Sequence, residues 1–187
     1  MIRSLQDRQE FWGEHYIKQC QGTTTFSKDL LRDTCRNKCV LEIGPGEGRQ
    51  FDAVFSVAKE YSITDICSVV LAQNKYDVCK GKYLLKSYTL DTDETFDVIH
   101  AWYVLHHVLS AELDSFTELV ARHLKPRGVW LFNYAWENRR KHSEDGKGTT
   151  RYSDSVIEQV LTHNGIEIVS KRCIDDRSME VLSMRVE

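Results

Sequence analysis

Three glycines and two carboxylates are the residues of this sequence whose types and spacing indicate chemistry. The glycines alternate with other residues in the run Gly44-Pro45-Gly46-Glu47-Gly48, and Glu42 stands two positions before it. Glycine permits a tight turn and lets a ligand approach the backbone closely. Glu42 is expected to point into the same pocket, where its carboxylate would accept a hydrogen bond from a cationic amino group. A second acid, Asp65, lies 21 residues beyond Gly44, where a nucleotide-binding fold grips a ribose diol.

The segments on either side of the glycines predict the elements that position them. Residues 39–43 are an apolar run that indicates a buried strand. Apolar residues recur at helical spacing from position 51, which predicts a helix with one core-facing side. Strand, glycine turn and helix together open a nucleotide-binding α/β fold, with the ligand against the helix N-terminus. A dinucleotide site would carry its third glycine at position 49, so Arg49 disfavours a dehydrogenase.

The pattern E-x-G-x-G-x-G resembles motif I of the class I S-adenosylmethionine-dependent methyltransferases, and the chain is similar to their small-molecule type (methyltransferase 11/12-like domains) over about residues 38–187. The resemblance implies S-adenosyl-L-methionine as the cofactor. Where the family commonly places an aspartate for the adenine amino group, this chain has Ser87, which can also accept a hydrogen bond. The cofactor-binding positions that we expect are Glu42, Gly44, Pro45, Gly46, Gly48, Asp65, Ile66, Ser87, Ala101 and Trp102.

The stretch FDVIHAWYVLHHV, residues 96–108, is the second informative segment. Its first six residues predict the fourth strand, and the rest predict the exit loop and the start of the next helix. The resemblance implies that this exit forms the floor between cofactor and acceptor. His107 and His106 are the candidate catalytic bases, because an imidazole titrates near neutrality and can take a proton from an attacking hydroxyl. The alternative is that one of them packs against or caps the helix.

The candidate acceptor contacts are Trp12, Tyr16, Tyr103, Arg139 and Arg140. The two N-terminal aromatic residues belong to an amphipathic helix expected at 3–20, which would cover the site or simply pack on the core. The two arginines belong to a polar loop expected at 136–151. Arginine suits phosphate because its fork donates two parallel hydrogen bonds, so the loop favours an anionic acceptor such as a phosphorylated sugar. The alternative is a solvated surface loop.

The remaining pattern predicts an α/β fold. Further strands are expected at 61–65, 82–86, 129–134, 166–171 and 179–186, and helices at about 27–36, 110–124 and 153–164. Together with the resemblance, this implies a Rossmann-like, seven-stranded, mostly parallel sheet with helices on both faces, a three-layer α/β/α sandwich. Residues 1–37 are expected to form a helical cap segment and residues 38–187 the S-adenosylmethionine-binding domain, within a single domain overall.

Charge, apolar runs and cysteine spacing limit the kinds of partner that we expect for this protein. The 187 residues carry a net charge of −3, which argues against a nucleic acid as the main partner. No run of about 18 apolar residues and no secretory signal are present, so we expect no membrane partner and a cytoplasmic location. The six cysteines form no C-x-x-C pair, so we expect no metal site.

The function expected from these features is methyl transfer from S-adenosylmethionine to an oxygen, or else a nitrogen, of a small-molecule acceptor. One alternative is a nucleic-acid (RNA) methyltransferase. Amino-methylating DNA enzymes carry an Asn/Asp-Pro-Pro-aromatic motif after the fourth strand, whereas this chain has Ala101-Trp102-Tyr103-Val104 there. The other alternative is a catalytically silent S-adenosylmethionine-binding protein. The sequence names neither the acceptor nor the oligomeric state.

Overall fold

The computed structural model describes residue 8 and residues 28–137, 143–144, 149–175 and 178–187. The chain divides into two compact units, Ile2–Asp93 and Glu94–Glu187. The expected N-terminal helix with Trp12 and Tyr16 lies outside the described residues, as do Arg139 and Arg140. No helix in the described part of the chain is long and apolar enough to cross a membrane.

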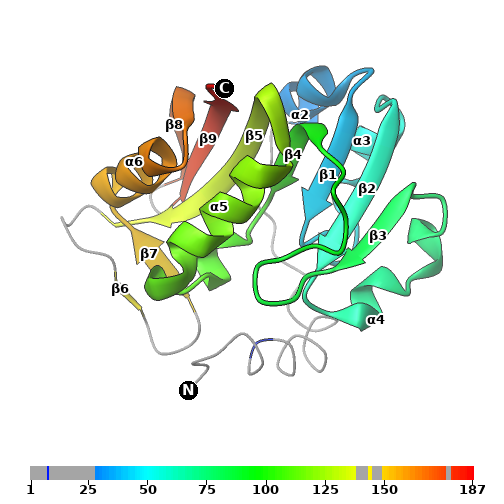
Figure 1. Ribbon diagram of the computed structural model, residues 1–187, viewed down its shortest axis with the longest axis horizontal. Coiled ribbons are helices and arrows are strands. Elements are labelled where there is room, and N and C mark those ends of the chain that lie inside the picture. The colour runs from blue at the N-terminus through cyan, green and yellow to red at the C-terminus, as the bar shows by residue number, and fades with distance from the viewer. Residues whose placement is uncertain (1–7, 9–27, 138–142, 145–148, 176–177) are drawn as a thin grey trace. The chain divides into compact units, whose positions relative to one another are not determined.

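Three parallel strands form the sheet of the first unit in the order β3-β2-β1 (Figure 1). They are β1 (Cys39–Ile43), β2 (Glu60–Asp65) and β3 (Gly81–Leu84). β1 and β2 are buried almost throughout, as is usual for parallel strands in the interior of a sheet. The last pair in the register joins Ile43 to Thr64, so the glycine turn and Asp65 lie at the same edge of this sheet.

Short helices precede and connect these strands. They are α2 (Lys28–Cys35), α3 (Phe51–Phe55), α4 (Ser68–Leu71) and the 3-10 turn η1 (Asn74–Tyr76). α2 and α3 agree with the helices expected before and after β1. Beyond β3, the backbone of Lys86 and Thr89 pairs across Ser87 and Tyr88, which both have positive φ. These four residues therefore form a tight hairpin turn.

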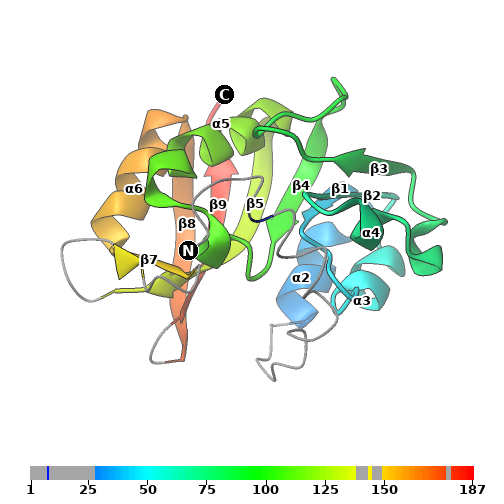
Figure 2. The ribbon, with the colours of Figure 1, turned by 90° about the horizontal axis from the view of Figure 1, so that it is seen from below.

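The second unit contains a mixed set of strands. β4 (Phe96–Ala101) runs parallel to β5 (Leu124–Trp136), while β9 (Ser178–Arg185) pairs antiparallel with both β5 and β8 (Ile166–Asp175). Two short strands, β6 (Ser143–Glu144) and β7 (Thr150–Tyr152), pair with each other, and β7 adds to the end of β5. The carboxyl ends of β4 and β7 thus gather beside the distal half of β5 (Figure 2).

Two helices cover one face of these strands. α5 (Leu113–His123) follows the 3-10 turns η2 (Leu105–His107) and η3 (Ser110–Glu112), and α6 (Asp154–His163) follows β7. Phe116 of α5 contacts Trp130 of β5 with ring centroids 6.1 Å apart. Trp130 stacks on Phe132 at 4.1 Å. Because residues 130, 132 and 134 alternate to one side of β5, this aromatic row forms the core beneath the helices.

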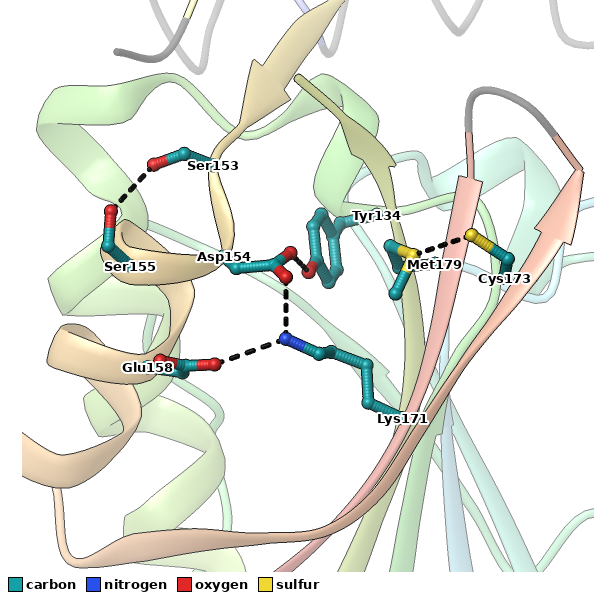
Figure 3. A network of polar contacts seen from close by, with 8 residues as sticks. All are labelled: Tyr134, Ser153, Asp154, Ser155, Glu158, Lys171, Cys173 and Met179. Carbon is teal, nitrogen blue, oxygen red and sulfur yellow. Dashed lines mark hydrogen bonds and ion pairs between the residues drawn. The ribbon is translucent and has the colours of Figure 1, made fainter. Parts of the chain in front are cut away.

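A polar network fixes the start of α6 to β5 and β8 (Figure 3). The Tyr134 hydroxyl donates to Asp154 at 2.6 Å, and the Lys171 ammonium pairs with the other oxygen of that carboxylate at 2.6 Å. Lys171 also reaches Glu158 at 3.1 Å. Burial favours the neutral form of Asp154, but the hydrogen bonds from Lys171 and Tyr134 outweigh it and lower its pKa. The network therefore holds an ionised carboxylate in the first turn of the helix, where the dipole favours it.

The structure differs from the expected elements in several places. β5 begins at Leu124, before the strand expected at 129–134, and contains an irregularity at Arg127, which has a φ of 61° and lies where the pairing with β4 shifts register. Gly128 is required there, because an added Cβ would lie 2.8 Å from the Lys125 carbonyl oxygen. The loop expected at 136–151 was wrong in part. Within it lie β6 and the start of β7, since the buried Thr150 and Tyr152 make β7 part of the core.

Candidate functional site

The glycine turn is the centre of the candidate site. Gly44, Gly46 and Gly48 have φ values of 68°, 52° and 74°, which side chains strongly disfavour. The Gly44 N–H donates to the Thr64 carbonyl at 2.8 Å, and the Gly48 N–H donates to the Pro45 carbonyl at 2.8 Å. The turn is thus tied to β2 and closed on itself. The three glycines are required by conformation, as the sequence pattern predicts.

Glu42 lies in β1 just before the turn and is only 2% exposed. Burial, together with the nearby charge of Asp65, raises its pKa to about 8. The Tyr61 hydroxyl donates a hydrogen bond to one oxygen of this carboxylate. Burying the ionised form of this carboxylate costs free energy, which a positively charged group of a ligand would offset.

Asp65 ends β2 at the same edge of the sheet. Burial raises its pKa to about 7, although the backbone N–H groups of Cys67, Ile66 and Gly46 donate to it and oppose the shift. The bond from the Cys67 N–H measures 2.8 Å. Through Gly46 the carboxylate is linked to the glycine turn itself. The first unit therefore brings Glu42, the glycines and Asp65 together, with two buried acids that ionise near neutrality.

Three side chains that the sequence analysis missed donate hydrogen bonds to carbonyl oxygens of the turn. Gln73 and Tyr76 both donate to the Gly46 carbonyl oxygen at 3.0 Å, and Lys75 donates to the Glu47 carbonyl oxygen. A Cβ at Gly48 would lie 3.0 Å from the Tyr76 hydroxyl. No spacing rule marks these residues, because their partners lie about 30 positions away in the chain.

Ser87 is an exposed corner of the hairpin turn after β3. Its neighbour Tyr88 accepts a hydrogen bond from the buried Arg8 at 3.0 Å. Arg8 belongs to the segment expected to cap the site. The adenine role of Ser87 remains a prediction.

The exit of β4 carries the other candidate residues, within the second unit. Ala101 ends the strand and Trp102 is 9% exposed. Tyr103 has a φ of 60°, and its N–H donates to the Asn133 side-chain oxygen at 2.7 Å. Asn133 is fully buried in β5 and is a residue that the sequence analysis missed. The signal that could have identified Asn133 is its position as a polar residue within the apolar run LFNYA.

The histidine pair lies in η2. The His107 N–H donates to the Val104 carbonyl at 2.8 Å, which closes the 3-10 turn in place of the expected helix start. His106 is 9% exposed and lies 5.0 Å from the Tyr103 ring, whereas His107 is half-buried. The second unit thus gathers both imidazoles with Trp102 and Tyr103 in one turn. Of the two, His107 is the more accessible.

Among the described residues, no group of histidines, cysteines and acids could hold a metal ion. The residues at the glycine turn fit an organic cation with a ribose, since both acids there are buried and their pKa values are raised to about 8 and about 7. The two acids suit the positively charged S-adenosylmethionine better than a negatively charged ligand.

Comparisons with known proteins agree with this geometry. Residues 41–130 match the family described as a methyltransferase domain. No curated protein sequence matches the chain. Among solved structures, magnesium protoporphyrin IX methyltransferase from Synechocystis PCC 6803, with bound S-adenosylhomocysteine, has a TM-score of 0.72 at 12% identity, covering 97% of this chain and 100% of that chain.

Two further structures are similar in fold. The Burkholderia thailandensis 1,6-didemethyltoxoflavin-N1-methyltransferase, with its toxoflavin precursor and S-adenosylhomocysteine bound, has a TM-score of 0.70 at 14% identity, covering 98% of this chain and 84% of that chain. The cyclase SpnF has a TM-score of 0.79 at 11% identity, covering 99% and 97%. The fold class is therefore the expected Rossmann-like, mostly parallel sheet with helices. The domain match over residues 41–130, together with motif I and the likeness in fold, supports the expected resemblance to the class I S-adenosylmethionine-dependent methyltransferases.

Proposed function

We propose that this protein transfers a methyl group from S-adenosylmethionine to an oxygen or nitrogen of a small-molecule acceptor. The observation that carries the proposal is the edge of the first unit's sheet. Three glycines with positive φ lie there between two buried carboxylates, Glu42 and Asp65. A cation with a ribose diol satisfies both acids at once, whereas a dinucleotide phosphate would face two negative charges.

The residues at the turn have distinct tasks. Glu42 would accept from the amino group of the cofactor, and Asp65 would accept from the two ribose hydroxyls. The glycine backbone leaves room for close approach. The bound cofactor supplies a methyl group on a positively charged sulfur. The chain itself contributes binding and orientation, which count for much of the rate when two reactants must meet in line.

His107, or else His106, would remove the proton from a neutral hydroxyl as it attacks the methyl carbon. Its accessibility and its place after β4 support His107 as the first choice. Trp102 and Tyr103, whose rings lie 5.6 Å apart, would form an apolar wall for the acceptor. Trp12, Tyr16, Arg139 and Arg140 are further acceptor contacts that we propose from the sequence alone.

The small-molecule class of acceptor is supported by the relatives in fold, one of which acts on magnesium protoporphyrin IX and another on 1,6-didemethyltoxoflavin. One of the structures similar in fold is a cyclase, so the same fold hosts different chemistry. The assay must therefore follow the methyl group and not cofactor binding alone.

The test is incubation of the protein with S-adenosylmethionine tritiated on the methyl group, together with metabolite fractions separated by charge and polarity. We expect label to enter a small organic product in wild type and to fall sharply in Asp65→Asn. Binding of the cofactor with no label transferred to any fraction would favour the catalytically silent alternative. Label in RNA but in no metabolite would favour the nucleic-acid alternative.

A further inference from the structure

Two buried tyrosines outside the glycine motif direct their hydroxyls at it. Tyr61 of β2 donates to the Glu42 carboxylate, which precedes the turn. Tyr76, the last residue of η1, donates to the Gly46 carbonyl oxygen within the turn at 3.0 Å. Tyr61 is 3% exposed and Tyr76 is 0% exposed. A buried hydroxyl with one well-placed acceptor has little freedom to turn elsewhere.

Both tyrosine rings pack against one phenylalanine. The Phe51 ring lies 5.7 Å from Tyr61 and 5.6 Å from Tyr76, with tilted and edge-on geometry. Such aromatic pairs favour offset or edge contacts over face-to-face stacking. The Phe51 N–H also donates to the Gly48 carbonyl at 3.1 Å. The ring that supports both tyrosines is therefore tied to the end of the turn that they contact.

The orientation of the Gly46 peptide groups depends on these contacts. The Gly46 N–H donates to Asp65, while its carbonyl oxygen accepts from Tyr76 and from Gln73, each at 3.0 Å. Glycine has no side chain to restrict its φ, and here φ is 52°. Partners on the N–H and on the carbonyl thus supply the restriction that the residue itself lacks. If the carbonyl were released, the N–H would no longer face Asp65 reliably.

We propose that Tyr76 and Tyr61 are positioning residues for the cofactor, acting through Gly46 and Glu42 respectively. Tyr76 holds the turn so that the Gly46 N–H supports the Asp65 carboxylate, and Tyr61 fixes the orientation of the Glu42 carboxylate by donating to one of its oxygens. The inference rests on the proposed function, because it concerns the cofactor site of the same reaction.

Three variants test the inference, each of which removes a hydroxyl and keeps the ring. They are Tyr76→Phe, Tyr61→Phe and the matched control Tyr83→Phe, on β3 and outside the motif. The measurement is the Kd for S-adenosylhomocysteine by calorimetry from pH 6 to pH 9, with Tm recorded alongside. We expect about 3- to 10-fold weaker binding for each of the first two, the range for loss of one hydrogen bond. Tyr83→Phe should stay within about twofold of wild type.

The pH profile separates positioning from mere packing. Loss of a donor to an ionised carboxylate raises its pKa, so the pH at which affinity reaches half its maximum should move upward in both variants. Besides Asp65, the titratable groups that interact with the charge of Glu42 are the thiols of Cys35 and Cys79. Burial raises the pKa of Cys35 to about 12 and that of Cys79 to about 11, so both stay neutral in this range.

Each outcome decides a separate question. If wild type does not bind S-adenosylhomocysteine at all, the proposed function and this inference fall together. If wild type binds, but Tyr76→Phe and Tyr61→Phe match Tyr83→Phe in affinity and pH profile, only the inference is overturned. A lower Tm with unchanged Kd would also overturn it. Should Tyr76→Phe fail to fold, Gln73→Met removes the second donor to the same carbonyl and gives the same readouts.

Discussion

Replacing Asp65 with asparagine should strengthen the fold and weaken the site at the same time. The pKa of Asp65 is raised by burial to about 7 from an ordinary value of 3.8. The folded protein therefore binds a proton that the unfolded chain releases between these two values. Stability is full below pH 4 and declines as pH rises to 7. A shift of about three units corresponds to roughly 4 kcal/mol, an upper bound on what Asp65→Asn could recover at pH 8.

The same acid makes binding depend on pH in the opposite direction. If the ribose diol requires the carboxylate, affinity should fall about tenfold per pH unit below 7, or about 100-fold from pH 8 to pH 5. Adenosine is the ligand for this measurement, because it carries the ribose diol but lacks the methionine part whose amino group Glu42 would bind. Asp65→Asn should bind it weakly at every pH, and urea unfolding at pH 8 should show a more stable protein. A less stable variant with unchanged affinity would make Asp65 a structural cap.

Three further predictions concern other parts of the chain. His107→Ala should lower kcat by roughly 10²–10⁴ at saturating cofactor while the cofactor Kd is unchanged; full activity at pH 7 would remove it as the base. Gly48→Ala should cost about 1–2 kcal/mol in urea unfolding, because φ is 74° and the new Cβ meets the Tyr76 hydroxyl at 3.0 Å; an unaffected midpoint would contradict this. Lys171→Met should cost at most about 1 kcal/mol at pH 7, less as pH falls through the lowered pKa of Asp154, and salt should screen the difference.

The sequence predicts the glycine turn and the neighbouring strands well because its signals are local. The bounds of β1 and β4 agree with the expected strands, and β2 begins one residue earlier than expected. β1 and β4 are short, mainly apolar runs next to a turn, and β2 is a short run with β-branched and aromatic residues, so composition suffices to predict them. The three glycines were identified for their conformation, and each has the positive φ that this requires.

What the sequence could not supply are partners from distant positions. Tyr61, Gln73 and Tyr76 read as ordinary residues of a strand and a turn, yet their side chains hold Glu42 and Gly46. Asn133 likewise fixes Tyr103 from 30 positions away. Hydrogen bonds of this kind follow from the packing of elements and leave no periodicity in the chain.

The extent of β5 was missed for a related reason. The run Lys-Pro-Arg-Gly indicates a turn, and the backbone does turn at Arg127, but pairing with β4 continues on both sides of it. The short strand β7 was read as loop because only three residues pair, and a strand of that length is defined by its neighbour.

The measurement that tests the central claim most directly is calorimetric titration with S-adenosylhomocysteine and, separately, with NAD. Wild type should bind S-adenosylhomocysteine with a Kd in the micromolar range, roughly −8 kcal/mol, and should show no heat with NAD. Glu42→Ala should abolish the first signal while the folded circular dichroism spectrum is retained. Clear heat with NAD and none with S-adenosylhomocysteine would contradict the account.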